Sequence, residues 1–394
     1  MTVPCPGATT DQEFTAICGF DPYDALRGAW VPGWVRAHPR LRQAVIQIRK
    51  RLPISLAPIF GVKPFVMAKA SGCFATAAAR TGDNKASEEV LTTLLESAPS
   101  GSAGAWGYEF DVQTRWAFYP ADSPNLIATV FVARSFGVAG TATGSDDYLM
   151  QLQLSADFLV GDLLSRHVEA PFFRYTLTSD RLVHNANLLG AGLVGMAGAL
   201  GGDSERVAHA IACARTTLAA QRPDGSWPYG DGEGLAWSDN FHTAYNLDGL
   251  LQVWLASGDE AVKRSLDKGV EHWVGDFFGP NGEPKYYPGR EYPYDIHSAG
   301  TAVDVAARLS TWGYETAELA DRVASWTERN LVNASTGETY YQKHRLWTDK
   351  RHFFRWGDAH WALGRSSTAL VRAGRKDPLE LAVAEASGVE QHAR

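Results

Sequence analysis

The chain has 394 residues, of which 45% are hydrophobic and 21% charged, so it has ample apolar surface for a core and wholesale disorder is excluded. Its 37 Lys+Arg against 44 Asp+Glu give a net charge of −7, which argues against a general nucleic-acid binder, because such proteins gain affinity by neutralising phosphates. The four cysteines include no CxxC pair, so we expect neither a disulfide framework nor a thiolate metal site. The 13 tryptophans are the unusual component.

The N-terminus, MTVPCPGATTDQEF, contains no basic region followed by an apolar run, so we predict no secretory signal and expect a cytoplasmic chain. Basic side chains precede the apolar stretch 52–60: Arg36, Arg40, Arg42, Arg49, Lys50 and Arg51. A basic helix beside apolar residues can rest on an anionic membrane surface. Because Pro53 and Pro58 interrupt a continuous amphipathic face, we favour a helix packed on the edge of the domain, with its arginines in water.

From residue 60 onward, helical patterns come in pairs, and an aromatic, glycine-rich loop precedes each pair. The first helices are predicted to begin near Pro64, Pro124, Asn185, Asn240, His297 and Gly357. In the third pair, residues 187–200 have almost no polar face, whereas residues 203–221 are amphipathic. A helix that is apolar all round is buried on all sides, so the pairs predict an inner and an outer ring.

We therefore predict an all-α fold, an (α/α)6 toroid of six helical hairpins. An open helical solenoid also has stacked pairs, but six units and no more favour a closed ring. The predicted organisation is an N-terminal extension over residues 1–35 and a single toroid domain over residues 36–390.

In a toroid, the loops that lead into the inner helices gather at one end, around the mouth of a cavity. The sequence places unusual aromatic and basic residues there, and aromatic side chains at loop ends are expected to face a ligand, such as a sugar, an isoprenoid chain or a carbocation. The candidate substrate-binding residues are Trp106, Tyr108, Arg115, His184, Trp227, Tyr229, Trp237, Tyr245, Tyr286, Tyr287, Arg290, Arg355 and Trp356.

Histidines stand at the starts of four inner helices, and three of them follow an aspartate by two or three residues. These pairs are the candidate catalytic residues Asp239, His242, Asp295, His297, Asp358 and His360. A carboxylate raises the pKa of a nearby histidine, and burial raises that of the carboxylate, so each pair is a tunable acid and base. A structural alternative is that the aspartates cap the helices, a role that Asp239 or Asn240 fits. The residues leave open which pair acts.

No HxxxH or HxxE spacing places metal ligands on one helix face, and the chain has no GxSxG elbow, no GxxxxGK[ST] loop and no GxGxxG after a strand. We therefore predict no metal or other cofactor.

Residues 221–227, QRPDGSW, resemble the Q-x-x-D-G-S-W repeat of squalene and terpene cyclases and protein prenyltransferases, which are α/α toroids. They also resemble turns in six-hairpin carbohydrate-active enzymes, including unsaturated glucuronyl hydrolases, polysaccharide lyases and sugar epimerases. The longer pattern over residues 237–250, 294–298 and 355–358 is similar to proteins found alongside exopolysaccharide biosynthesis enzymes. The resemblance covers about residues 20 to 375 and is more specific for the toroid than for the reaction.

The chain lacks the D-x-D-D and D-D-x-x-D motifs of terpene cyclases and prenyl synthases, although Asp295 beside His297 could protonate an isoprenoid. The residue types that glycan chemistry requires are simpler to supply. Hydrolysis uses two carboxylates, and epimerisation or β-elimination at a uronic acid uses a base, an acid and a cation. The basic residues in 343–355 indicate an anionic substrate, a uronate or a lipid-linked sugar phosphate.

We therefore predict an enzyme acting on a glycan or glycan precursor, a uronic-acid type hydrolase, lyase or epimerase that uses Asp/His acid–base catalysis in the toroid cavity. The expected partner is a glycan or lipid-linked small molecule, with no nucleic acid. Two alternatives stay open: an isoprenoid cyclase or prenyltransferase-like enzyme, and a non-catalytic glycan-binding protein.

Overall fold

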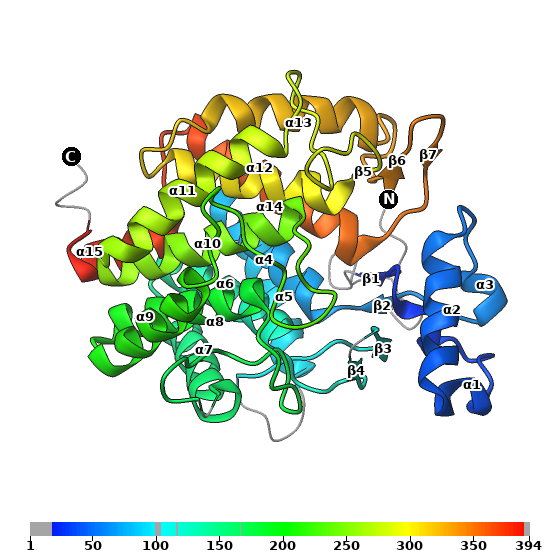
Figure 1. The fold of residues 1–394 in the computed structure, drawn as a ribbon, viewed down its shortest axis with the longest axis horizontal. Coiled ribbons are helices and arrows are strands. Elements are labelled where there is room, and N and C mark those ends of the chain that lie inside the picture. Colours follow the sequence, from blue (N-terminus) through cyan, green and yellow to red (C-terminus); the bar gives the residue numbers. More distant parts are fainter. Residues whose placement is uncertain (1–17, 99–103, 116, 166, 390–394) are drawn as a thin grey trace.

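The computed structural model describes residues 18–98, 104–115, 117–165 and 167–389, and it is a helical toroid (Figure 1). The inner ring consists of α4 (Ala68–Thr81), α6 (Leu126–Thr143), α8 (His184–Gly201), α10 (Asn240–Ser257), α12 (Ile296–Ser310) and α14 (Ala359–Arg372). Each is followed by its hairpin partner: α5 (Asn84–Glu96), α7 (Asp146–Phe158), α9 (Ser204–Leu218), α11 (Glu260–Asp276), α13 (Ala317–Leu331) and α15 (Pro378–Ser387). All six inner helices begin within four residues of the predicted positions.

The inner ring is closed, because α14 packs against α4 as well as against α12. This confirms the toroid and excludes the open solenoid. Glycines let the backbones of neighbouring inner helices touch: a Cβ on Gly72 of α4 would lie 2.8 Å from the carbonyl oxygen of Phe131 on α6, and one on Gly249 of α10 would lie 2.5 Å from that of Leu188 on α8. The small residues of the inner helices are therefore a packing requirement.

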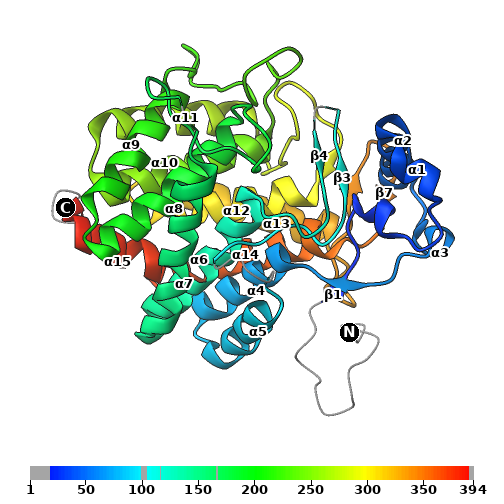
Figure 2. The same cartoon turned by 90° about the horizontal axis from the view of Figure 1, so that it is seen from below.

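The sixth hairpin departs from the predicted arrangement of inner and outer helices. Helix α15 packs against α6, α8 and α10, and it buries Leu379, Val383 and Ala384. It lies at the opposite end of the molecule from the N-terminal helices (Figures 1 and 2). Two buried ion pairs hold it, one between Arg308 and Glu380 and one of 2.7 Å between Arg80 and Asp377. The last helix therefore crosses the end of the ring. Of the six second helices that were expected to form the outer ring, five do so.

The N-terminal helices form a small cluster beside the toroid. They are the 3-10 helix η1 (Asp24–Arg27) and the helices α1 (Gly33–Ala37), α2 (Pro39–Arg51) and α3 (Ala57–Phe60). Their apolar centre contains Ala25, Leu26, Val31, Val35 and Ile46. Arg351 fastens α2 to the toroid, because its guanidinium donates to the carbonyl oxygens of Arg49 (2.6 Å) and Lys50 (2.8 Å). The division of the chain at residue 35 stays a prediction.

Short strands and turns hold the loops between hairpins in defined conformations. The strands are β1 (Cys18–Gly19), β2 (Phe65–Val66), β3 (Val112–Gln113), β4 (Phe118–Tyr119), β5 (Tyr294–Asp295), β6 (Gln342–Lys343) and β7 (Thr348–Asp349). Antiparallel pairing joins β1 to β2, β3 to β4, and β5 to β6 to β7. Two π-helical turns, η2 (Leu159–Leu163) and η3 (Phe354–Asp358), extend α7 and lead into α14. Because β5 leads directly into α12, its pairing places the start of that inner helix.

The cysteines and the most apolar helix bear on the expected redox state and location of the chain. Cys18 is disulfide-bonded, a single bond that the expectation of no disulfide framework did not anticipate, whereas Cys73 and Cys213 are buried free thiols. Disulfides persist mainly in oxidising compartments, so this bond does not support the expected cytoplasmic location. Among the described residues, α6 is the one helix long and apolar enough to cross a membrane, but 83% of that stretch is buried inside the toroid, as befits an inner helix.

Candidate active site

The loops before the inner helices enclose a cavity of about 350 Å³ at one end of the toroid. Eleven of the predicted site residues line it: Asp239, His242, His297, Tyr108, Tyr229, Trp237, Tyr245, Tyr286, Tyr287, Arg355 and Trp356. These residues come from four different hairpins and are up to 248 positions apart in the chain, from Tyr108 to Trp356. The convergence follows from the toroid, which brings the entrances of all inner helices to the same end.

The first functional group in the cavity is the Asp239–His242 pair at the start of α10. One carboxylate oxygen of Asp239 accepts from the His242 backbone N–H at 2.9 Å, so Asp239 is the N-cap of the helix. Both carboxylate oxygens also lie 2.9 Å from His242 Nδ1. Asp239 therefore caps the helix and also contacts the His242 ring, and a carboxylate on Nδ1 leaves Nε2 as the nitrogen free to exchange a proton.

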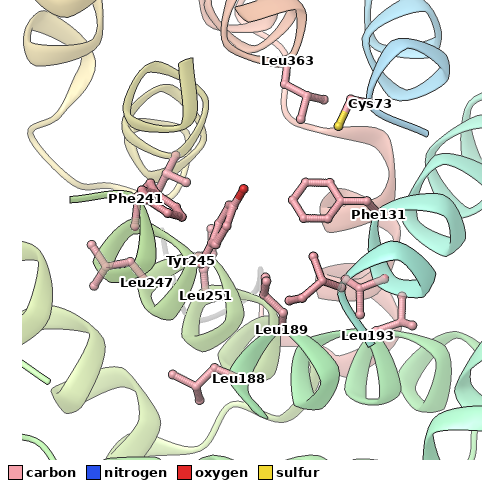
Figure 3. Packing of buried hydrophobic residues seen from close by; sticks show 14 of the residues in the cluster. Cys73, Phe131, Leu188, Leu189, Leu193, Phe241, Tyr245, Leu247, Leu251 and Leu363 are labelled. Atoms are coloured by element: carbon pink, nitrogen blue, oxygen red, sulfur yellow. The ribbon is translucent and has the colours of Figure 1, made fainter. Parts of the chain in front are cut away.

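The second group is centred on the hydroxyl of Tyr245, three residues beyond His242 on α10. This hydroxyl lies 3.0 Å from His297 Nε2, 3.5 Å from His360 Nε2 and 3.4 Å from the amine of Lys69. Figure 3 shows the Tyr245 side chain projecting into the interior of the inner ring, opposite the ring of Phe131 from α6. Side chains from α4, α10, α12 and α14 thus meet at one phenol oxygen.

The partners of His297 identify its protonation state. Its Nδ1 lies 3.2 Å from the carbonyl oxygen of Trp356, which only accepts, so Nδ1 carries the hydrogen and Nε2 accepts from the Tyr245 hydroxyl. Burial, assisted by the positive charges of neighbouring groups, holds the pKa of His297 well below its usual value. His297 is therefore a neutral imidazole that orients the hydroxyl of Tyr245, whose own pKa is raised well above the usual value by burial.

Lys69 is a buried amine, 3% exposed, near the start of α4. Its Nζ lies 4.3 Å from the centre of the Phe131 ring, a cation–π contact, and no carboxylate among the described residues forms an ion pair with it. Burial, together with the charge of Arg355, lowers the pKa of Lys69 to about 7. Near neutral pH this amine can therefore gain a proton when an anion arrives beside it.

Aromatic rings form the walls of the cavity. Tyr229 and Trp237 stack with their ring centres 4.4 Å apart and their planes at 12°. The ring of Phe241 contacts those of both His242 (3.9 Å between centres) and His297 (4.7 Å), so it connects the two functional groups. Flat walls of this kind suit the faces of sugar rings.

Two of the three predicted Asp–His pairs are wrong in the structure. Asp295 accepts from the His297 backbone N–H (2.8 Å), the indole N–H of Trp356 (2.9 Å) and the Gln342 amide (2.7 Å), and it does not contact the His297 ring. Burial raises the pKa of Asp295 to about 6, but this carboxyl lies behind the cavity wall. It caps α12 and braces Trp356, so the cavity does not end at the acid that the isoprenoid alternative needs.

Asp358 likewise pairs with a different histidine. It accepts from the backbone N–H (3.0 Å) and the hydroxyl (2.8 Å) of Thr339, and its second oxygen binds His352. His360 instead lies behind Tyr245, with Nδ1 3.4 Å from the Thr301 hydroxyl. Sequence spacing misled here because the π-helical turn η3, which ends at Asp358, carries this carboxylate away from the side chain two residues later.

Five predicted substrate-binding residues lie outside the cavity lining. Trp106 and Trp227 are each 1% exposed and belong to the hydrophobic core, whereas Arg115 and Arg290 are exposed. The fifth, His184, is fully buried beside the Thr217 hydroxyl (3.1 Å), and burial lowers its pKa to about 4.

The resemblance motif 221–227 has a structural role here. The amide of Gln221 donates to the carbonyl oxygens of Gly225 and Ser265, both at 3.0 Å, and thereby ties the turn to α11. Gly225 has φ of +89°, which favours glycine, and the Trp227 ring fills the space above Gly269 of α11. The motif therefore stabilises the toroid, and its tryptophan does not reach the ligand.

Several residues that line the cavity were not among the predicted site residues. They include Tyr23, Lys50, Lys69, Tyr119, Tyr175, Asn185 and Phe241. Lys69 and Asn185 lie in the first two residues of inner helices, at the same place as the chosen histidines, so the same argument would have found them. Lys50 and Tyr23 come from the N-terminal cluster, and nothing in the repeat points to them.

The charges that line the cavity are unequal. Lys50, Lys69, Arg181 and Arg355 are cationic, whereas Asp239 is the one carboxylate among the described lining residues. Arg355 forms an ion pair with the buried Asp21, with 2.7 Å between the guanidinium and the carboxylate oxygen. Within the described part of the chain no three His, Cys, Asp or Glu side chains are grouped so that they could hold a metal ion. The lining therefore provides acids, bases and an excess of cationic side chains.

No protein-family model matches the chain, and no curated protein matches it by sequence. Solved structures do match its fold. An unsaturated glucuronyl hydrolase specific for heparin is 14% identical with a TM-score of 0.57, over 77% of this chain and 86% of that one. The cellobiose 2-epimerase from Bacillus thermoamylovorans is 10% identical with a TM-score of 0.60, over 78% and 87%. A D-mannose isomerase is 10% identical with a TM-score of 0.57, over 78% and 87%. At such low identity the likeness shows the fold alone.

Proposed function

We propose that this protein is an enzyme that moves protons at a carbon atom of an anionic sugar, as a uronic-acid epimerase or lyase. The observation that carries the proposal is the presence of two acid–base groups in one cavity, Asp239–His242 and Tyr245–His297, in contact through Phe241. Solved structures of similar fold named as a glucuronyl hydrolase and a sugar epimerase make a sugar substrate reasonable.

The first step is removal of the proton on the carbon next to the substrate carboxylate. His242 Nε2 is the base, because Asp239 on Nδ1 stabilises the imidazolium that forms. The C–H bond breaks and its electron pair moves into the carboxylate, which becomes an enolate. Lys69, which has no carboxylate partner among the described residues, carries the positive charge that stabilises this enolate.

The second step is delivery of a proton by Tyr245. Its hydroxyl is protonated at rest, because burial raises its pKa, and His297 and Lys69 hold it in position. Protonation of the same carbon on the opposite face inverts its configuration, which is epimerisation. If instead the carbon–oxygen bond next to the enolate breaks, Tyr245 protonates the departing oxygen, which is β-elimination.

Hydrolysis of a glycosidic bond is less well supported, because it requires two carboxylates on either side of the bond. Asp239 is the one carboxylate among the described lining residues, and it is engaged by His242. Isoprenoid cyclisation lacks its acid, because Asp295 lies behind the wall. The cationic lining also favours a uronate over a neutral sugar or a hydrocarbon.

The test is a panel of oligosaccharides containing glucuronate, galacturonate or mannuronate, incubated with the full chain in D2O, with neutral oligosaccharides as the comparison. Epimerase or lyase activity places deuterium at the carbon next to the carboxylate, or produces an unsaturated uronate, and NMR or mass spectrometry detects either. New reducing ends with neither change would replace the proposal by hydrolysis. Binding without any reaction on the whole panel would replace it by a glycan-binding role.

A further inference from the structure

Residues 28–63, the part of the N-terminal cluster that follows η1, expose an unusual number of large apolar side chains. Of twelve such exposed side chains in the described part of the chain, six belong to this segment, and Trp30 (68% exposed), Trp34 (64%) and Ile59 (64%) stand out among them. The other three are Ile48, Leu52 and Ile54. Exposed tryptophan and isoleucine are costly in water, so a concentration of them in 36 residues indicates a surface that meets an apolar medium.

The local structure keeps these side chains outward. The interior of the cluster is already filled by Leu26, Val31, Val35 and Ile46. The Trp30 ring lies against Gly61, 3.0 Å from where a Cβ would stand, so the loop after α3 supports the indole while most of it stays exposed. Trp34 follows on α1, in the same exposed segment. Tryptophan is the side chain most characteristic of the boundary between water and lipid, because its ring is apolar and its N–H is polar.

The charge of residues 28–63 is opposite to that of the whole protein. Residues 28–63 contain seven Lys and Arg and no Asp or Glu, in a chain whose net charge is −7. Part of this charge is used internally, since Arg49 pairs with Asp24 (2.5 Å) and Lys50 with the hydroxyl of Tyr23. Arg40, Arg51 and Lys63 are exposed. These cations point to a partner that is both apolar and anionic.

As expected, no single helix runs through Pro53 and Pro58, but the segment forms one helix on each side of Pro53. Helix α2 runs unbroken from Pro39 to Arg51 and ends before Pro53, and Pro58 lies in the first turn of α3, where proline is well tolerated. The cluster also borders the cavity, because Lys50 of α2 lines it. We propose that residues 28–63 dock on an anionic phospholipid bilayer, with the tryptophans at the interface and the cavity mouth beside the membrane.

The experiment measures binding of the full chain to two kinds of sedimenting vesicle. One is phosphatidylcholine alone, and the other is phosphatidylcholine with about 30 mol% phosphatidylserine. We expect at least tenfold stronger binding to the anionic vesicles, and a loss of this difference in high salt. The double variant Trp30→Ala with Trp34→Ala should reduce binding at least tenfold. Its matched control, Leu346→Ala with Trp347→Ala, removes two exposed apolar side chains elsewhere and should not change binding.

A second pair of variants keeps the test independent of folding around Trp30. Arg40→Glu with Arg51→Glu should abolish the preference for anionic vesicles, whereas Lys85→Glu with Arg372→Glu, at exposed positions on other helices, should leave it unchanged. Equal or absent binding to both vesicle types would overturn the proposal. So would a concentration-dependent dimer that the Trp30 and Trp34 variants dissociate, because the surface would then belong to a second copy of the chain.

Discussion

The hydroxyl of Tyr245 lies 3.0 Å from Nε2 of His297, although 52 residues separate them. Tyr245 projects from α10 and His297 from α12, and both side chains line the same cavity. Because His297 is neutral and its Nδ1 faces a carbonyl oxygen, the tyrosine hydroxyl is held in one place with its proton. This contact makes Tyr245 the proposed proton donor.

The first prediction concerns Tyr245 itself. Tyr245→Phe removes the hydroxyl but keeps the ring, so turnover of a uronate substrate should fall by about 10²–10⁴-fold, the usual contribution of a general acid. Tyr294→Phe is the matched control, because Tyr294 is equally buried (4% exposed) but packs on Trp326 away from the cavity. Steady-state kinetics of both variants test the assignment. Equal losses in both would mean that the effect is on folding.

The second prediction separates the two roles of Asp239. Asparagine is also a good N-cap, so Asp239→Asn should leave the thermal midpoint unchanged while activity falls by about a hundredfold, since His242 loses its carboxylate. Asp239→Ala should lose the activity and, in addition, about 1 kcal/mol of stability. Thermal unfolding and kinetics on the two variants distinguish these effects. Full activity in Asp239→Asn would show that the carboxylate is a cap alone.

The third prediction is the pH dependence of substrate binding. The pKa of Lys69 in the folded protein is about 7, so the amine is charged below that pH and uncharged above it. Affinity for a uronate should therefore fall as the pH rises through 7, and Lys69→Arg, which stays charged, should remove this dependence. Calorimetric titration between about pH 5.5 and 8.5 measures this affinity in both proteins. A flat wild-type profile would contradict the role of Lys69.

The fourth prediction is that the amine of Lys69 affects stability in the opposite direction, so that stability rises with pH. The unfolded chain holds a proton on Lys69 up to about pH 10.4, whereas the folded protein releases it above about 7, so protonation favours unfolding and wild-type stability gains from a rise in pH between these values. Lys69→Met should be more stable than wild type at pH 7, by about 1–3 kcal/mol, the cost of burying an amine that has no carboxylate partner among the described residues. This advantage should shrink as the pH approaches 10. Urea unfolding across this range tests it.

The fifth prediction concerns the end of the ring opposite the cavity. Arg308 binds Asp248 (2.6 Å), Asp304 (3.3 Å) and Glu380, all buried, and so ties α15 to α10 and α12. Arg308→Met leaves these carboxylates without their partner and should cost about 3–5 kcal/mol. Arg322→Ala, which breaks the exposed Arg322–Glu318 pair, should cost about 0.5 kcal/mol or less. Urea unfolding of the two variants gives the comparison.

How far the site could be predicted depended on whether a residue's role is set by its place in the repeat. Asp239 and His242 lie at the start of α10 and line the cavity, as their spacing predicted, whereas His184 and His360 stand at equivalent helix starts and do not line it. Asp358 has a similar spacing in sequence but sits at the end of a π-helical turn, which redirects its carboxylate to His352. Trp227 carries a recognisable motif, yet the motif serves the turn and the core.

The sequence by itself determined the ring of hairpins, because the spacing of apolar helices, their glycines and their capping aspartates are local properties repeated along the chain. Tertiary structure alone decided what lies at each end of that ring. Helix α15 crosses one end because its apolar face and Glu380 find partners on α6, α8, α10 and α12 rather than on its neighbours in sequence. At the other end, Lys69, Tyr245 and His297 meet because closure of the ring brings α4, α10 and α12 together. Such contacts depend on distances across the ring, which no local pattern of residues encodes.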